Sequence, residues 1–480
     1  MENQKQKFLS KIQDPDYFTS KILQRKMLPF QLNILRSVRD NPRTAVRSCH
    51  GIGKTFTAAS CVLWFLYSHK NSIVLSTAPT WRQVEKLIWK EIRNAYAGAS
   101  IPLGGELMPK SPSLQIVQDE WYAAGLSTNE PDRFQGFHEE HILIVVDEAA
   151  GISNEIYEAI EGILTSAGAR ILLIGNPTAI GGGFYEAFQR ESWSTFHISA
   201  FDTPNFTDFG ITQIDITTGK WKQKIGEIQY PKLITPAWVA DKYLSWGESS
   251  APYQVRVLGN FPEQGEDTLI PIAWIEAAME RYDDTKAEGE CRLGVDVAGF
   301  GNDATVVCVM QGRKLREITR HTQMNTNEIA ALVSRTARRF NTRLVNVDNI
   351  GIGQGVCDNL ENRGYPGCAI TVSERSSQPD KFLNLRAELW WNMREAFDPT
   401  KNPIAIPYDD DLLLELSAVK YRITARGLIQ LEMKDEIRRR IGRSPDKADA
   451  LALALYTEGG SGFVISGGRS ITADIWRDRY

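Results

Sequence analysis

The stretch that decides the fold reads Ser48-Cys49-His50-Gly51-Ile52-Gly53-Lys54-Thr55. It follows a short strand expected at 44–47 and precedes a helix expected from about Thr55. Its glycines let backbone N–H groups face a phosphate, and the positive end of the helix points to the same place. Lys54 can reach the outer phosphates of a nucleotide, and the Thr55 hydroxyl is a ligand for Mg²⁺. Ser48 stands where such loops usually carry their first glycine, and a plain strand-to-helix turn is the alternative.

A second motif lies about ninety residues further on, where the apolar run 142–146 ends in Asp147 and Glu148. Such a run, apolar on both faces, is typical of a strand in a buried parallel sheet. Ligands bind at the carboxyl edge of these sheets. We therefore expect Asp147 to hold Mg²⁺ and Glu148 to act as general base on the attacking water, which predicts ATP hydrolysis. The alternative is that these acids only cap the next helix.

Four further residues fit a nucleotide site less specifically. Gln31 lies shortly before the loop and could read the edge of adenine, or it is a surface glutamine. Asn176 ends the strand expected at 170–175, where it could sense the γ-phosphate or simply form a turn. Arg47 and Arg133 are candidates for the arginine that stabilises the transferring phosphate, and each could equally be an ordinary surface charge.

Length and composition predict a multidomain α/β protein. The 480 residues, 42% of them hydrophobic and 24% charged, are enough for two or three globular domains. We expect a first domain over 1–200, a proline-punctuated linker over 201–290, a second α/β domain over 291–458 and a flexible tail over 459–480.

Composition also excludes some classes of protein. The longest apolar run is far shorter than the roughly 20 residues that a membrane-spanning helix needs. The six cysteines form no CxxC pair, which argues against a zinc site and fits a reducing cytoplasm. A net charge of −4 excludes a histone-like coat of positive charge, so DNA contact requires local basic patches.

The second half of the chain carries a series of acids on expected elements: Asp296, Asp348, Asp446 and Asp449. Asp296 lies between apolar residues in the middle of an expected strand, a costly place for an unpaired charge, and Asp348 ends another strand. Asp446 and Asp449 follow Pro445 and share one face of a helix. Several carboxylates on one sheet cannot all stay charged without a counter-ion, so we expect Mg²⁺ or Mn²⁺, with two ions for phosphodiester hydrolysis. Each acid taken alone could be a helix cap or one half of a salt bridge.

Basic residues gather close to the last of these acids in the sequence. Positive charge beside a metal–carboxylate site suits a polyanion such as DNA, although such a run is often only a solvated face. The predicted DNA-binding residues are Lys420, Arg422, Arg426, Arg438, Arg439, Arg440 and Arg443.

The order of these motifs, over about residues 25–458, resembles the large subunit of tailed-phage terminases. The resemblance also rests on Arg133-Phe134-Gln135-Gly136-Phe137-His138 and on Gly175-Asn176-Pro177. It implies a P-loop ATPase domain of the ASCE type with a mostly parallel sheet, followed by an RNase H-like nuclease domain. It assigns ATP and Mg²⁺ roles to Lys54, Thr55, Asp147 and Glu148. It also assigns nuclease metal roles to Asp296, Asp348 and Asp446, with Asp449 in support.

The same resemblance implies partners and a place of action. These are double-stranded viral DNA, a portal protein, a small terminase subunit and a homo-oligomeric ring on the portal, with no membrane. The expected location is the host cytoplasm, with transient docking on the procapsid and absence from the mature virion. Because Cys49 stands where some members carry a basic residue, we expect Arg133 to act across the subunit boundary, with Arg47 as second choice.

Two other functions remain open on sequence alone. One is a helicase-like DNA translocase whose second half only binds DNA. The other is a non-enzymatic scaffold that binds nucleotide as a switch.

Overall fold

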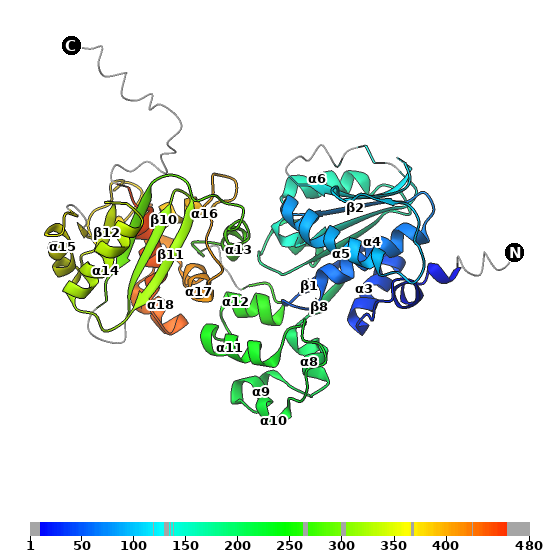
Figure 1. Ribbon diagram of the computed structural model, residues 1–480, viewed down its shortest axis with the longest axis horizontal. Helices are drawn as coiled ribbons and strands as arrows, with labels where there is room; N and C mark the ends of the chain where they lie inside the picture. The colour runs from blue at the N-terminus through cyan, green and yellow to red at the C-terminus, as the bar shows by residue number, and fades with distance from the viewer. Residues whose placement is uncertain are drawn as a thin grey trace, which may run out of the picture. The chain divides into compact units, whose positions relative to one another are not determined.

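The computed structural model describes residues 10–118, 120–128, 134, 136–137, 139–262, 267–298, 304–365, 369–424 and 426–457. The chain forms two compact units, Met1–Glu263 and Gln264–Tyr480 (Figure 1). The predicted linker is thus shared, with 201–262 described in the first unit and 267–290 in the second; the four-part division stays a prediction. The predicted tail at 459–480 lies outside the described residues. No helix in the described ranges is both long and apolar enough to span a bilayer.

The first unit is built on an eight-stranded sheet with the order β3-β4-β5-β2-β6-β7-β1-β8. All neighbours from β5 to β8 in this order are parallel, whereas β3, β4 and β5 pair antiparallel. The strands are β1 (Arg43–Ser48), β2 (Ile73–Ala78), β3 (Glu106–Leu107), β4 (Ser113–Val117), β5 (Trp121–Ser127), β6 (Ile142–Asp147), β7 (Arg170–Gly175) and β8 (Ser194–Ile198).

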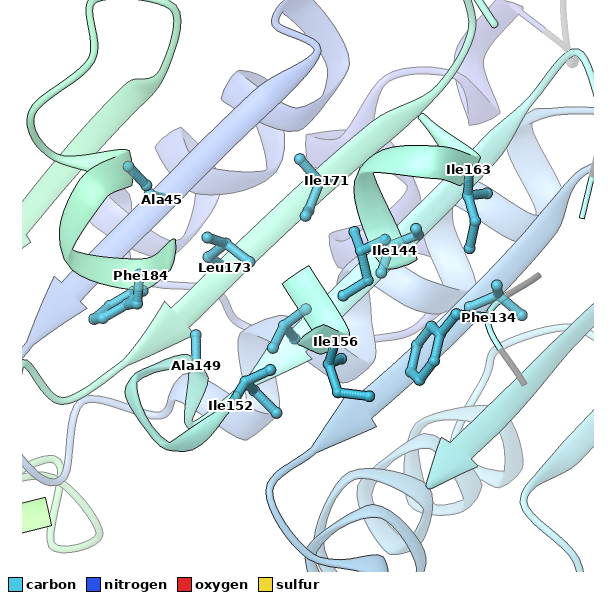
Figure 2. Packing of buried hydrophobic residues seen from close by; sticks show 14 of the residues in the cluster. Ala45, Phe134, Ile144, Ala149, Ile152, Ile156, Ile163, Ile171, Leu173 and Phe184 are labelled. Carbon is cyan, nitrogen blue, oxygen red and sulfur yellow. The ribbon is translucent and has the colours of Figure 1, made fainter. Parts of the chain in front are cut away.

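Helices cover both faces of this sheet, as burial of both faces of β2 and β6 requires. Figure 2 shows one covered face, where Ile144 and Leu173 of the strands meet Ile156 and Phe184 of the helices. Burying each side chain of this size contributes about 1.5–3 kcal/mol. The helical segments are α2 (Pro15–Tyr17), η1 (Phe18–Ile22), α3 (Pro29–Asp40), α4 (Lys54–Ser68), η2 (Gln83–Ile88), α5 (Trp89–Ala97), η4 (Ala149–Gly151), α6 (Asn154–Ile163) and α7 (Gly182–Ala187).

A set of short helices follows β8 and closes the first unit. Prolines begin several of them, which explains why the sequence breaks into short pieces here. The segments are η5 (Ala200–Asp202), α8 (Pro204–Thr207), α9 (Gln213–Thr218), α10 (Trp221–Lys224), α11 (Pro236–Trp246), α12 (Ala251–Tyr253) and η6 (Gln254–Leu258).

The second unit has a five-stranded sheet with the order β11-β10-β9-β12-β13. The first three strands are antiparallel and the last three parallel. A two-stranded antiparallel hairpin, β14–β15, stands apart from the sheet. The elements are α13 (Ile272–Glu280), β9 (Cys291–Asp296), β10 (Thr305–Gln311), β11 (Lys314–His321), α14 (Thr326–Arg339), β12 (Val345–Asp348), α15 (Gly353–Glu361), β13 (Ala369–Ile370), α16 (Leu385–Phe397), α17 (Asp410–Ala418), β14 (Tyr421–Ile423), β15 (Ile429–Leu431), α18 (Lys434–Ile441) and α19 (Asp446–Leu455).

Alternate residues of β9 point to opposite faces of this second sheet. Leu293 and Val295 pack against α14, in a cluster that includes Val333. Gly294 faces α19 so closely that a Cβ atom there would lie 2.0 Å from the carbonyl oxygen of Ala450. This glycine therefore lets the helix that carries two of the predicted acids approach the strand that carries Asp296.

Candidate functional site

The phosphate loop lies between β1 and α4, at the carboxyl edge of the first sheet. Gly53 precedes α4 in the left-handed conformation (φ 82°), which an L side chain rarely adopts. Lys54 is the first residue of the helix, and its Nζ donates to Asn176 Oδ1 at 2.8 Å. The same Nζ lies 3.6 Å from Glu148 Oε1. The structure thus brings together three of the predicted nucleotide-site residues.

Asp147 and Glu148 stand at the end of β6, beside the loop. The Thr55 hydroxyl donates to Asp147 Oδ2 at 3.1 Å, so the two predicted Mg²⁺ ligands are already in contact. Burial, reinforced by the charge of Glu148, raises the pKa of Asp147 to about 7. Glu148 has a left-handed backbone (φ 48°), an uncommon conformation that aims its side chain back at Lys54.

The rear of the loop is fixed by the rest of the first unit. Asn176 Nδ2 donates to the Ser48 carbonyl at 2.6 Å, so this side chain bridges the loop and Lys54. The Cys49 N–H donates to the Ile198 carbonyl, and the His50 N–H to that of Arg256, both at 2.9 Å. The Gly51 carbonyl accepts from Ile234 N–H at 3.0 Å. The loop is therefore joined by its backbone to β8 and to the short helices after it.

Gln31 lines a cleft of about 700 Å³ next to Gly53 and Thr55. Its amide is engaged at both ends: Oε1 accepts from Leu28 N–H, and Nε2 donates to the Ile52 carbonyl, each at 2.9 Å. The structure gives this residue a role in holding the loop, and its reading of adenine stays a prediction.

Of the two arginine candidates, only Arg47 lies within the described residues. Arg47 donates to the Gly259 carbonyl at 2.9 Å, and its guanidinium lies 5.4 Å from the centre of the Phe261 ring. Burial lowers the pKa of Arg47, and its role in stabilising the transferring phosphate stays a prediction. Arg133 lies outside the described residues, so the preferred candidate remains a prediction.

The acids of the second unit meet at the carboxyl ends of β9 and β12 and the amino end of α19. Asp296, Asp348 and Asp446 line a cleft of about 420 Å³ together with Arg386 and Lys434. Asp449 lies one helical turn beyond Asp446, and the charges of both raise the pKa of Asp296. The structure thus brings together all four acids that the sequence singled out.

Burial and mutual repulsion dominate the electrostatics of this cluster. Burial raises the pKa of Asp296 well above its usual value, and that of Asp348 as well. Burial also opposes ionisation of Asp449, but Lys434 and Arg386 outweigh it, and the pKa of Asp449 is lowered. A cluster of this kind needs positive charge to remain ionised.

Lys434 is a functional-site residue that the sequence did not reveal. Its Nζ lies 2.7 Å from Asp449 Oδ2, and the charge of Asp449 raises the pKa of Lys434. Trp390 was also missed; its Nε1–H donates to Asp449 Oδ1 at 2.7 Å. In the described part of the chain, no three Asp, Glu, His or Cys side chains are grouped closely enough to hold a metal ion. The lysine ammonium is the counter-ion of this arrangement.

The predicted DNA-binding residues divide into two groups. Three form ion pairs within the second unit: Lys420 with Asp267, Arg440 with Glu432, and Arg443 with Asp411. The remaining four are solvent-exposed, namely Arg422, Arg426, Arg438 and Arg439. Lys420 and Arg440 are also exposed in part, with side-chain exposures of 40% and 37%.

Sequence comparison finds relatives of both the second unit and the whole chain. Residues 293–391 match the family model described as the Terminase RNaseH-like domain. The "Probable terminase, large subunit" of Enterobacteria phage P7 is 23% identical over 443 residues, covering 87% of this chain and 85% of the relative. The chain is similar to phage large terminase subunits. Both the predicted resemblance and the predicted fold class are confirmed: a P-loop ATPase fold with a mostly parallel sheet, then an RNase H-like α/β fold.

Solved structures of terminase subunits are also similar to this chain. The ATPase domain from Thermus phage P74-26 is 19% identical and covers 51% of this chain and 97% of that domain, with a TM-score of 0.37. The nuclease domain of gp2 from bacterial virus Sf6 is 18% identical and covers 40% and 99%, with a TM-score of 0.35. The large terminase of a thermophilic bacteriophage, solved in complex with ADP, is 11% identical and covers 88% and 98%, with a TM-score of 0.38.

Proposed function

We propose that this chain is the motor and nuclease subunit of a viral DNA-packaging machine. It would drive double-stranded DNA into the procapsid by ATP hydrolysis and cut concatemeric viral DNA in a metal-dependent endonuclease reaction. The observation that carries the proposal is the contact of Lys54 with Asn176 and Glu148 at one sheet edge. A separate cluster of acids in the other unit supports the second activity.

ATP hydrolysis would use the residues of the first unit in distinct roles. Lys54 would exchange Asn176 for the outer phosphates, which form stronger, charge-assisted hydrogen bonds. Glu148 would accept the proton of the attacking water, with its carboxylate already at the loop. Thr55 and Asp147 would hold Mg²⁺, which neutralises charge on the phosphates. Asn176 would report the loss of the γ-phosphate through its bond to the loop.

DNA cutting would use the acids of the second unit. Asp296, Asp348 and Asp446, with Asp449 in support, would be the ligands for Mg²⁺ or Mn²⁺, because burial raises the pKa of Asp296 and Asp348 and a bound cation would favour their charged forms. Such ions activate water and stabilise the leaving oxygen of a phosphodiester. Exposed Arg422, Arg426, Arg438 and Arg439 would bind the DNA backbone.

The proposed setting is the cytoplasm of the host cell. There the subunit would form a ring on a portal protein, aided by a small terminase subunit, while docked on the procapsid. The relationship to phage large terminase subunits supports these partners.

Two substitutions in the full chain test whether the activities reside in separate sites. Lys54→Ala should abolish DNA-stimulated ATP turnover and packaging while Mn²⁺-dependent plasmid nicking continues at the wild-type rate. Asp296→Asn should abolish nicking while ATP turnover continues. Loss of both activities in either variant would contradict two separate catalytic sites. Wild-type ATPase without any nicking would favour a translocase whose second unit only binds DNA.

A further inference from the structure

The helix that carries two of the nuclease acids has an unusual cap. α19 begins at Asp446, and its N-cap residue, Pro445, has no side chain that can accept a hydrogen bond. The first backbone N–H groups of a helix lack partners within the helix and need an acceptor. Here the acceptor is Glu415 Oε2, which receives the Lys447 N–H at 2.8 Å and the Ala448 N–H at 3.1 Å.

Glu415 comes from α17, about thirty residues away in sequence, and only 3% of it is exposed. Its other oxygen lies 3.5 Å from Arg443 Nε. Arg443 in turn pairs with Asp411 of α17 at 2.7 Å, and Lys447 Nζ lies 2.7 Å from Asp409. Arg443, just before α19, and Lys447, within it, are thus tied to the start of the same helix that supplies the capping carboxylate. We call Glu415, Arg443 and Lys447 with these two aspartates the α17–α19 clamp.

The acids held by this clamp lie where a helix is least stable. Asp446 and Asp449 are both in the first turn of α19, and terminal turns fray unless their N–H groups are satisfied. Gly294 allows β9 to approach α19 at Ala450 and Ala454, beyond Asp446 and Asp449. The two hydrogen bonds from the Lys447 and Ala448 N–H groups to Glu415 tie the first turn itself to α17.

We propose that Glu415 is a positioning residue for the nuclease reaction, which sets Asp446 and Asp449 against Asp296 by capping α19 from a neighbouring helix. The proposal rests on the nuclease function proposed above. It also gives Arg443 a different role from the exposed arginines before it in the sequence. Arg443 holds the capping carboxylate, whereas the exposed Arg439 can contact the DNA backbone.

The cap requires an acceptor oxygen at this position and does not require a full negative charge. Burial raises the pKa of Glu415 to about 8, although the charge of Arg443 and the hydrogen bond from Ala448 oppose this shift. A glutamine has the same shape, and its carbonyl oxygen can accept the same two N–H groups. Glu415→Gln is therefore the conservative replacement, and Glu415→Ala removes the acceptor.

The experiment compares Glu415→Ala, Glu415→Gln and Val333→Ala in the full chain. Val333 is fully buried on the opposite face of the sheet, so its truncation destabilises the unit without touching α19. Measurements are Mn²⁺ binding by electron paramagnetic resonance, kcat and KM for plasmid nicking, and ATP turnover as an internal control for the first unit.

Glu415→Ala should weaken Mn²⁺ binding and lower the nicking kcat by about 10–100-fold, as for loss of other groups that orient metal ligands, with KM for DNA unchanged. Glu415→Gln should stay close to the wild type, and so should Val333→Ala at temperatures where it is folded. Equal losses in Glu415→Ala and Val333→Ala would overturn the proposal, as would a Glu415→Gln variant as impaired as Glu415→Ala.

A second pair of variants separates the clamp from DNA binding. Arg443→Ala should reproduce the fall in kcat and in Mn²⁺ binding, whereas Arg439→Ala should raise KM for DNA and leave both unchanged. The opposite pattern would overturn the assignment of Arg443. If the wild-type chain neither nicks DNA nor binds Mn²⁺, the proposed nuclease function is wrong. If the wild type is active and Glu415→Ala has the same nicking kcat and Mn²⁺ binding, only the positioning role of Glu415 is wrong.

Discussion

The two sites of this chain share one plan and differ in how their positive charge is held. Each gathers carboxylates at the carboxyl ends of buried strands, beside a single lysine. In the first unit, Lys54 shares its ammonium between Asn176 at 2.8 Å and Glu148 at 3.6 Å. In the second unit, Lys434 lies 2.7 Å from Asp449. The first lysine bonds to a neutral amide, whereas the second forms a close ion pair with a carboxylate.

This difference matches the ligands proposed for the two sites. A lysine held by a neutral amide and a distant carboxylate can turn to an incoming anion at little cost, which suits the phosphates of ATP. A lysine that neutralises a buried carboxylate leaves a cluster that can still accept cations, since Asp296 and Asp348 have raised pKa values. The first site is thus prepared for a polyanion and the second for additional positive charge.

The largest effect that would separate the two sites is expected for Glu148→Gln. This change removes the proton acceptor but keeps the shape of the side chain near Lys54. ATP turnover should fall by about 10²–10⁴-fold, the usual contribution of a general base. ATP binding, measured by calorimetry, should persist, and plasmid nicking should not change. A variant that still turns over ATP at the wild-type rate would assign the proton transfer to another group.

Replacing Lys434 tests whether the ion pair with Asp449 supplies the positive charge of the second site. Lys434→Ala leaves the buried Asp449 without its main charge partner. Because the Lys434 side chain is itself 39% exposed, the cost is smaller than the roughly 3–5 kcal/mol of a fully buried ion pair. The melting temperature of the metal-free variant should therefore be lower than that of the wild type. Adding Mn²⁺ should raise the melting temperature of the variant by more than it raises that of the wild type. Lys401→Ala, which changes an exposed lysine of the same unit, is the control. Equal Mn²⁺ stabilisation in wild type and Lys434→Ala would show that the ammonium and the metal do not share these carboxylates.

The sequence revealed the first site more completely than the second, for a physical reason. The phosphate loop is local: Lys54 and Thr55 are recognisable from neighbouring glycines, and Asp147 and Glu148 from the apolar strand before them. The acids of the second site were also visible, because Asp296 stands between apolar residues of the predicted strand, where an unpaired charge is costly. Lys434 carried no such signal, because an isolated lysine at the start of a polar helix looks like surface charge.

The interaction partners of long charged side chains could not be predicted from the sequence either. Arg47 stands next to the loop in sequence, but its guanidinium binds the Gly259 carbonyl more than two hundred residues away. Arg443 ends a basic run, yet it is paired with Asp411. Periodicity predicts which elements form, whereas the partner of a long, charged side chain depends on the packing of distant segments.

The smallest expected effect concerns the pH dependence of stability in the first unit. The pKa of Asp147 is about 7 in the folded chain, against an ordinary value of 3.8, because of burial and the charge of Glu148. Between these values the folded state keeps a proton that the unfolded state releases. Without nucleotide and metal, stability should therefore fall as pH rises from about 4 to about 7, by at most about 1.4 kcal/mol per pH unit.

Asp147→Asn should remove this contribution and make the decline shallower. Hydrogen exchange of peptides covering β6, with EDTA present, measures the pH dependence of stability in the first unit alone. The titration of acids in the second unit does not contribute to this measurement. Mg²⁺ with an ATP analogue should flatten the wild-type curve in the same way, because a bound cation keeps Asp147 ionised in the folded state. If the wild-type and Asp147→Asn curves run parallel without ligands, Asp147 is ionised at neutral pH in the free protein. The first site would then hold its carboxylates charged before any nucleotide arrives, with Lys54 alone as their counter-ion.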